Sequence, residues 1–249
     1  MASQACCKLS PVSDDYQAQG KYETIGGLKT YVIGPEKPTK VIIDIYDIFG
    51  ISPQTLQGAD RLAAHTGAAI LVPDFFVGDG LPHDALPMDT DEKKKIVGDF
   101  FTGVANVEDN LAKLLAVRKD IATKFPEAED HVGAFGLCWG GKLAVLAGGE
   151  GNEGAGRRLN ATGTAHPGLL DEKDAKAQMA PHLLLASKDE PKDIVAAYQT
   201  AMGDKAEVTT YDNMHHGWMG ARANLKDQDN VKEFQRGYEQ AAAFFSKHL

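Results

Sequence analysis

The chain has 249 residues, of which 43% are hydrophobic and 24% charged, and a formal net charge of −9. These values are ordinary for one folded domain, so we expect a single domain over residues 1–249, with residues 1–20 as an N-terminal arm. The negative charge argues against nucleic acid or an anionic membrane as a partner. The three cysteines form no disulfide framework and no apolar run has the ~18 residues of a membrane span, so we predict a cytoplasmic location.

The first half of the chain alternates short apolar runs with helical patterns. A helix is predicted to begin at Ser52-Pro53, and the apolar pattern from 91 to 124 predicts a helical region that breaks near Gly103. The alternating run at 28–33 predicts an exposed strand. The β-branched runs at 41–46 and 68–72 predict strands that are buried on both faces.

The second half repeats this alternation. Strands are predicted at 132–137, 161–165, 182–186 and 207–211, and helices at 191–202 and 231–248. Short buried runs that alternate with helices are typical of a mostly parallel central sheet with helices on both faces. The predicted fold class is therefore α/β.

One stretch carries the clearest chemical pattern. The apolar run 132–137 is followed by Cys138, Trp139 and two glycines, then by a helical segment, which is the G-x-S-x-G pattern with Cys in place of Ser. A strand that turns at once into a helix holds its central residue at a strained backbone angle, and Gly136 and Gly140 remove collisions across the turn. Such a corner presents Cys138 at a helix N-terminus, where the helix dipole stabilises a thiolate. A buried structural cysteine is the alternative interpretation.

Three reactive groups each follow a predicted strand. Cys138 follows 132–137, Asp189 follows 182–186, and His216 follows 207–211. Catalytic groups of parallel sheets gather at the carboxyl ends of the strands, and the order nucleophile, acid, histidine is that of α/β-hydrolases. We expect His216 to take the thiol proton and Asp189 to orient the imidazole.

Alternatives remain open for several of these residues. Asp189 is of a residue type that commonly caps the N-terminus of a helix, so it could cap the following helix instead. His215 directly precedes His216, and His166 ends a predicted strand on the same side of the sheet. A metal site built from Asp212, His215 and His216 is conceivable, but no further ligand lies at suitable spacing. The glycine-rich segment 148–158 lacks a phosphate-binding motif, so phosphate binding is not predicted there.

These motifs resemble the dienelactone hydrolase (carboxymethylenebutenolidase) family from about Tyr22 to Leu249. The similar segments are Asp47-Ile48-Phe49-Gly50, Pro73-Asp74-Phe75-Phe76, Gly136-Leu137-Cys138-Trp139-Gly140-Gly141 and His216-Gly217-Trp218. The resemblance implies an α/β-hydrolase fold and a Cys138–His216–Asp189 triad that hydrolyses a strained lactone or activated ester without a cofactor. A homodimer is conceivable.

The resemblance also implies further site residues. Backbone N–H groups of Ile48 and Trp139 would form the oxyanion hole, and Asp47 would bond the resting thiol. Phe76, Trp218 and Arg222 would lie near the substrate. Relatives that act on dienelactone carry an Arg soon after the Pro-Asp motif, whereas Val77-Gly78 stand here and no Arg appears before Arg118. A less polar substrate is therefore expected, with Arg222 as the candidate cation.

Two other functions compete with hydrolysis. The missing Arg after Phe76 is compatible with a non-catalytic protein that binds a small molecule or has a regulatory role on the same fold. A thiol at a helix N-terminus is also compatible with a redox sensor at Cys138. The roles of Cys6, Cys7 and His166 stay open.

Overall fold

The computed structural model describes residues 10–150, 152 and 157–249, so Cys6 and Cys7 lie outside the described residues. Its centre is an eight-stranded sheet in the order β1-β2-β4-β3-β5-β6-β7-β8. The strands are β1 Lys21–Ile25, β2 Leu28–Ile33, β3 Val41–Ile45, β4 Ala69–Pro73, β5 Val132–Leu137, β6 Ala161–Ala165, β7 His182–Ser187 and β8 Ala206–Tyr211. β1 pairs with β2 and β2 with β4 in antiparallel register, and every other pair is parallel.

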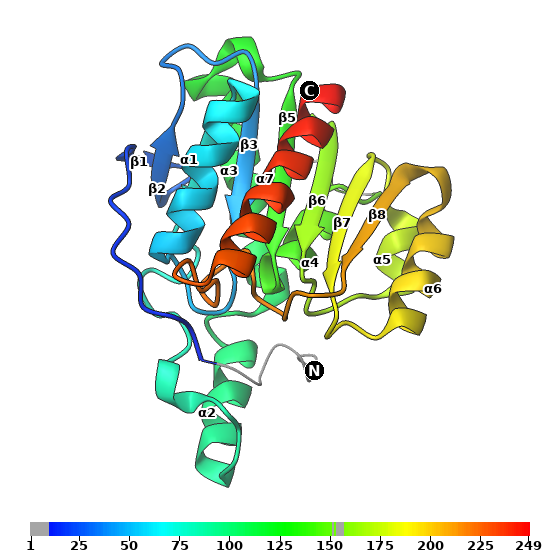
Figure 1. Cartoon of the computed structure of the whole chain (residues 1–249). Helices are drawn as coiled ribbons and strands as arrows, with labels where there is room; N and C mark the ends of the chain where they lie inside the picture. The colour runs from blue at the N-terminus through cyan, green and yellow to red at the C-terminus, as the bar shows by residue number, and fades with distance from the viewer. Residues whose placement is uncertain (1–9, 151, 153–156) are drawn as a thin grey trace.

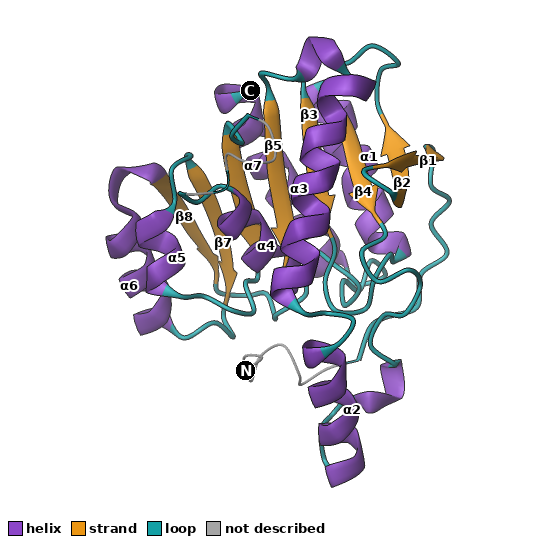
Figure 2. Ribbon diagram, turned by 180° about the vertical axis from the view of Figure 1, so that it is seen from behind, coloured by secondary structure: helices purple, strands orange, loops and turns teal. Residues whose placement is uncertain are grey.

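Helices cover both faces of this sheet. The helices are α1 Pro53–Thr66, α2 Asp91–Thr102, α3 Val107–Lys124, α4 Trp139–Ala147, α5 Glu172–Ala177, α6 Lys192–Met202 and α7 Gln228–His248. Figure 1 shows α1 and α7 side by side on one face, and Figure 2 shows α3 and α4 on the other. This arrangement is the α/β-hydrolase fold.

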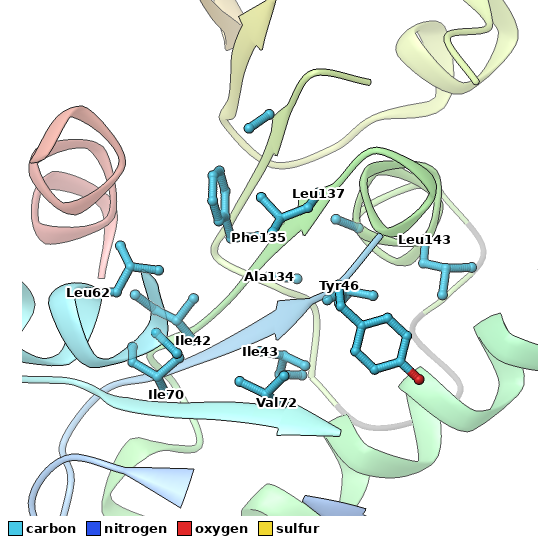
Figure 3. Close-up of a cluster of buried hydrophobic side chains, with 14 of the residues drawn as sticks. Ile42, Ile43, Tyr46, Leu62, Ile70, Val72, Ala134, Phe135, Leu137 and Leu143 are labelled. Atoms are coloured by element: carbon cyan, nitrogen blue, oxygen red, sulfur yellow. The ribbon is translucent and has the colours of Figure 1, made fainter. Parts of the chain in front are cut away.

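The sheet interior is apolar on both faces, as the β-branched runs predict. Ile42 and Ile70 lie toward Leu62 of α1, while Ile43 and Val72 point to the opposite side of the two strands (Figure 3). These five side chains are fully buried. Burying a side chain of this size contributes roughly 1.5–3 kcal/mol, so these strands help to stabilise the sheet and to fix the positions of the loops at its carboxyl edge.

The predicted strands and α-helices agree with the structure in place and type, and the structure adds one strand and one α-helix to them. The helical region breaks where expected, since α2 ends at Thr102 and the side chain of Asn106 caps α3 by accepting from Glu108 and Asp109 N–H. β1 and the short α5 were not predicted, because both segments are polar and partly exposed. The arm ends where β1 begins, and the N–H of Val12 donates to the carbonyl of Ala221.

One helix departs from the layers. α2 extends away from the body beyond the carboxyl ends of the strands (Figure 1). It remains tied to the body through Phe100, whose ring lies 5.2 Å from that of Phe76. Within the described residues, no helix is sufficiently long and apolar to cross a membrane.

Candidate active site

The corner between β5 and α4 has the strained geometry that its glycines predict. Cys138 has φ 53° and ψ −110°, a conformation that costs free energy in a residue with a side chain. A Cβ on Gly136 would lie 2.1 Å from the carbonyl oxygen of Gly140, and one on Gly140 would lie 2.2 Å from that of Ile45. Only glycine fits at either position, so the sequence holds the corner in this form.

The thiol meets an imidazole from the far end of the chain. Nε2 of His216 lies 3.1 Å from Sγ of Cys138, although the two residues are 78 positions apart. Both side chains are buried, with 1% of each residue exposed. Gly217 has φ 96° and lets the chain turn directly after His216, while the aliphatic part of Arg222 packs over its Cα. The structure therefore brings together the predicted nucleophile and the predicted base.

The carboxylate on the imidazole is one residue away from the predicted one. Oε1 of Glu190 lies 2.7 Å from Nδ1 of His216, whereas Oδ2 of Asp189 accepts a 2.8 Å hydrogen bond from the backbone N–H of His216. The other oxygen of Glu190 accepts from the N–H of Ser187. Glu190 thus contacts the ring, and the expectation that Asp189 does so is wrong. Asp189 instead anchors the loop that carries the ring.

The reason for this exchange is local backbone geometry. Both carboxylates belong to the tight turn between β7 and α6, where the N–H of Asp189 donates to Oγ of Ser187. In this turn the shorter side chain reaches the neighbouring backbone and the longer one reaches the ring. Glu190 is 4% exposed, but no sequence signal separates it from the adjacent acid. Only the folded turn identifies it.

The two predicted oxyanion-hole donors are the backbone N–H groups of Trp139 and Ile48. Trp139 is the first residue of α4, so its N–H has no helical carbonyl one turn earlier. The N–H of Ile48 donates to no backbone carbonyl among the described residues. The first turn of α4 abuts the end of β3, as the contact of Gly140 with the Ile45 carbonyl shows. The loop that carries Ile48 therefore begins beside the nucleophile corner.

Asp47 braces this loop rather than standing free to bind the thiol. Its two carboxylate oxygens accept from the N–H groups of Phe49 and Ala221, at 3.0 and 2.9 Å. Burial raises the pKa of Asp47, and these two N–H groups together with the Arg222 charge oppose that shift. The carboxylate ties the first loop to the segment after His216.

The three residues predicted to lie near the substrate are in different environments in the structure. Phe76 packs 4.7 Å from the Trp139 ring, centroid to centroid, and so lies beside the nucleophile corner. The guanidinium of Arg222 lies 5.0 Å from the ring centroid of Phe49, next to the loop of Ile48. Trp218 instead is fully buried against Tyr211 of β8, with centroids 4.4 Å apart. Its placement near substrate is therefore wrong, because its ring fills the core between β8 and α7.

The conceivable metal site does not assemble. His215 Nε2 faces the carbonyl of Arg222 at 3.2 Å, and Asp212 pairs with Lys192. His216 is engaged by Cys138 and Glu190. Among the residues that the structure describes, no group of three or more His, Cys, Asp or Glu is placed to hold a metal ion. The arrangement combines a thiol, an imidazole and a carboxylate in sequence, which is suited to nucleophilic catalysis.

Comparisons with known proteins identify the family of the chain. Residues 28–249 match the model of the dienelactone hydrolase family. An AIM2 family protein of Schizosaccharomyces pombe, named as uncharacterized, is 35% identical, with 97% of this chain and 98% of the relative covered. A carboxymethylenebutenolidase homolog of Xenopus tropicalis is 32% identical over 57% of this chain and 55% of its own length.

A solved structure shares the fold. The dienelactone hydrolase of Anabaena variabilis superposes with a TM-score of 0.64 at 17% identity, covering 94% of this chain and 98% of that one. The family match spans most of the chain and includes the nucleophile corner, the acidic turn after β7 and the histidine loop. The chain belongs to the dienelactone hydrolase family and has its hydrolase fold.

Proposed function

We propose that the protein is a cysteine hydrolase that cleaves a lactone or an activated carboxylic ester through an acyl-enzyme. The observation that carries the proposal is the continuous line from Cys138 Sγ to His216 Nε2, at 3.1 Å, and from His216 Nδ1 to Glu190 Oε1, at 2.7 Å. A thiol becomes a strong nucleophile when an oriented imidazole takes its proton. Family membership supports hydrolysis as the reaction class.

Each group has a definite role in the first half of the reaction. His216 accepts the thiol proton while Sγ bonds to the substrate carbonyl carbon, and Glu190 stabilises the resulting imidazolium. The N–H groups of Ile48 and Trp139 hold the oxygen that becomes negative, a contribution worth ~10²–10³ in rate for each donor. When the C–O bond breaks, His216 returns the proton to the departing alkoxide.

The second half uses the same groups in reverse. Water gives a proton to His216 as its oxygen bonds to the acyl carbon, and the carbon–sulfur bond then breaks. The proton returns to the sulfur, so the enzyme is regenerated without a redox change and no cofactor is needed. A lactone yields a hydroxy acid in this scheme, and an ester yields an acid and an alcohol.

The surroundings of the nucleophile favour a substrate with apolar or aromatic character. The rings of Tyr46, Phe76 and Trp139 contact one another, with centroids 4.7–6.4 Å apart. Val77 and Gly78 follow Phe76, where dienelactone-hydrolysing relatives have the Arg that binds a carboxylate. We therefore expect aryl esters and hydrophobic lactones to be turned over faster than a carboxylate-bearing lactone.

The test is a panel of aryl esters and lactones assayed with wild type and with Cys138→Ala. We expect the substitution to abolish turnover while the circular dichroism spectrum and the melting temperature stay close to those of wild type. The control is the double variant Cys6→Ala, Cys7→Ala, which should keep full activity. Intact-mass analysis of rapidly quenched wild type should show one acyl adduct that the Cys138→Ala variant lacks.

Two outcomes would contradict the proposal. Unchanged turnover by Cys138→Ala would exclude this nucleophile. If wild type saturates with a panel compound but hydrolyses none, the alternative of a non-catalytic small-molecule-binding protein would replace the hydrolase.

A further inference from the structure

A second strained corner lies beside the nucleophile corner. His166 follows β6 directly and has φ 39°, the other side of the Ramachandran plot from its strand neighbours, and Pro167 follows it. The N–H of Cys138 donates to the carbonyl of Ala165 at 3.0 Å, and the N–H of Gly168 donates to the carbonyl of Cys138 at 3.3 Å. Both backbone groups of the nucleophile therefore bond to residues that flank the 166–167 corner.

The same corner is fixed from its other side. The N–H of His166 donates to the carbonyl of Leu185 in β7 at 2.7 Å. β7 leads into the turn that carries Glu190, so the backbone of His166 is held between the strand of the nucleophile and the strand of the acid. A side chain at this position has little freedom to move relative to either group.

The imidazole of His166 is placed against the imidazole of His216. The ring centroids are 5.2 Å apart and the planes meet at 68°, an edge-to-face contact of favourable geometry. His166 is fully buried, and neither ring nitrogen has a hydrogen-bond partner among the described residues. Buried polar atoms are normally satisfied, so a histidine kept here in spite of this cost calls for an explanation.

Burial and the charges around it disfavour a positive charge on this ring. Burial holds the pKa of His166 well below its usual range, and the positive charges of His216, Arg222 and His215 lower it further. The other ionisable groups that face the two rings are Cys138 after β5, Asp47 after β3, and Asp189 and Glu190 after β7. His166 therefore adds no positive charge beside the one that develops on His216 during acylation.

We propose that His166 is a positioning residue, whose ring forms the wall that keeps the His216 ring in line between Glu190 and Cys138. This inference rests on the proposed function for its catalytic consequence, but the ring contact itself does not. The His216 ring has a hydrogen-bonding partner at each nitrogen and can still tilt about the line that joins them. The edge of His166 limits that tilt, and a misplacement of about 1 Å costs up to ~10²-fold in rate.

A purely conformational role is the competing explanation, because His, Asn and Asp are the side chains that tolerate positive φ most readily. His166→Asn separates the two, since Asn accepts the backbone angle but has no ring. His166→Phe retains a ring of similar breadth without nitrogens. His182→Asn is the control, because His182 is also fully buried but lies at the opposite end of the sheet, bonded to Thr162.

The experiment measures kcat and KM for an aryl ester, together with the downfield proton signal of the His216 Nδ1–H that bonds to Glu190. We expect His166→Asn to lower kcat about 10- to 100-fold with KM within about twofold, and to broaden or shift that signal. His166→Phe should keep the signal and most of kcat. His182→Asn should leave both unchanged, whatever it does to the melting temperature.

Two results would overturn the assignment. Wild-type kcat and an unchanged signal in His166→Asn would mean that the ring positions nothing. If His166→Asn is active and His166→Phe is not, a side-chain polar group at 166 matters rather than a ring. The proton signal reports the contact without turnover, so a wild type that hydrolyses nothing would refute the proposed function and still leave the positioning role decided.

Discussion

The interior of the sheet and its carboxyl edge bury acidic side chains in opposite ways. Asp44 lies in β3 and is fully buried, and neither carboxylate oxygen has a hydrogen-bond partner among the described residues. Asp47 lies three residues further along and is also buried, but both of its oxygens accept from backbone N–H groups. Glu190 is bonded to the ring of His216 and to the N–H of Ser187.

The difference shows that hydrogen-bond donors and nearby positive charges, rather than burial, keep a carboxylate ionised and able to stabilise a positive charge. Burial alone raises the pKa of Asp44 to about 8, so this side chain is a neutral acid at pH 7. At the edge, N–H donors, the His216 ring and the Arg222 charge are available to stabilise a negative charge. Only the edge can therefore hold a group that stabilises an imidazolium.

The largest effect on kcat should come from replacing, one at a time, the two acidic residues after β7 by their amides. Glu190→Gln leaves His216 without a carboxylate at Nδ1, and we expect kcat to fall by ~10²–10⁴, since removal of the charge from such a triad has effects of this order. Asp189→Asn keeps an oxygen that can accept from the N–H of His216, so its kcat should fall about tenfold or less. Steady-state kinetics on one aryl ester measures both.

If Asp189→Asn lowered kcat more than Glu190→Gln, the acidic member of the triad would be Asp189. A matched check is Glu190→Asp, which keeps the charge but shortens the side chain. Its kcat should lie between those of wild type and Glu190→Gln, and equal activity of all three would mean that the contact to His216 has no catalytic value.

The next effect concerns the stability of the sheet interior. The folded state keeps the Asp44 proton up to a pKa of about 8, whereas an unfolded Asp releases it near its ordinary pKa of 3.8. Between these values the unfolded state binds fewer protons, so stability falls as pH rises. From pH 5 to pH 7 this group alone should remove up to about 2–3 kcal/mol from the free energy of unfolding.

Denaturant unfolding of wild type and Asp44→Asn at several pH values measures this slope. Asn cannot ionise, so the variant should lose less stability than wild type over the same range, and the difference between the two should grow toward pH 8. Parallel curves would show that Asp44 does not carry a proton in the folded protein.

The smallest of these effects, on both stability and kcat, is expected for a substitution of Asp47 in the loop after β3. In Asp47→Asn one oxygen still accepts an N–H, but the amide nitrogen faces the second N–H, and the lost bond costs about 1–2 kcal/mol of stability. Because Asp47 braces the loop of Ile48, kcat should also fall, though less than in Glu190→Gln. Denaturant unfolding and ester kinetics test the two parts.

A different result would change the role assigned to Asp47. An increase in the reaction rate of Cys138 with iodoacetamide, combined with unchanged stability, would favour the thiol-binding role that the family resemblance implies. The expected outcome is lower stability with little change in that rate.

Much of the fold follows from local patterns. The β-branched run of β3, the glycine-bounded corner at Cys138 and the break at Gly103 each have a cause within a few residues, and the structure has all three where they are predicted. β1 pairs with β2 at the outer edge of the sheet, and its polar, exposed residues give no burial pattern from which a strand can be predicted.

Some features of the site also follow from the sequence, and others depend on the folded structure. The chain order of the reactive groups and the strands before them predict that Cys138 and His216 meet, because parallel strands end at one edge. Which of two adjacent acids reaches the ring depends on side-chain length and on the turn that Ser187 stabilises. The core position of Trp218 depends on the packing of α7 against β8, which no motif encodes.

The sequence by itself determined the order of the strands along the chain, the strained cysteine corner and the family, because these depend on neighbouring residues and on their spacing. The tertiary structure decided that Glu190 holds His216, that Asp47 ties two loops together and that His166 lies edge-on to the imidazole. The physical reason is that contacts of a few ångströms between distant segments depend on how the loops pack, and local pattern contains no such distance.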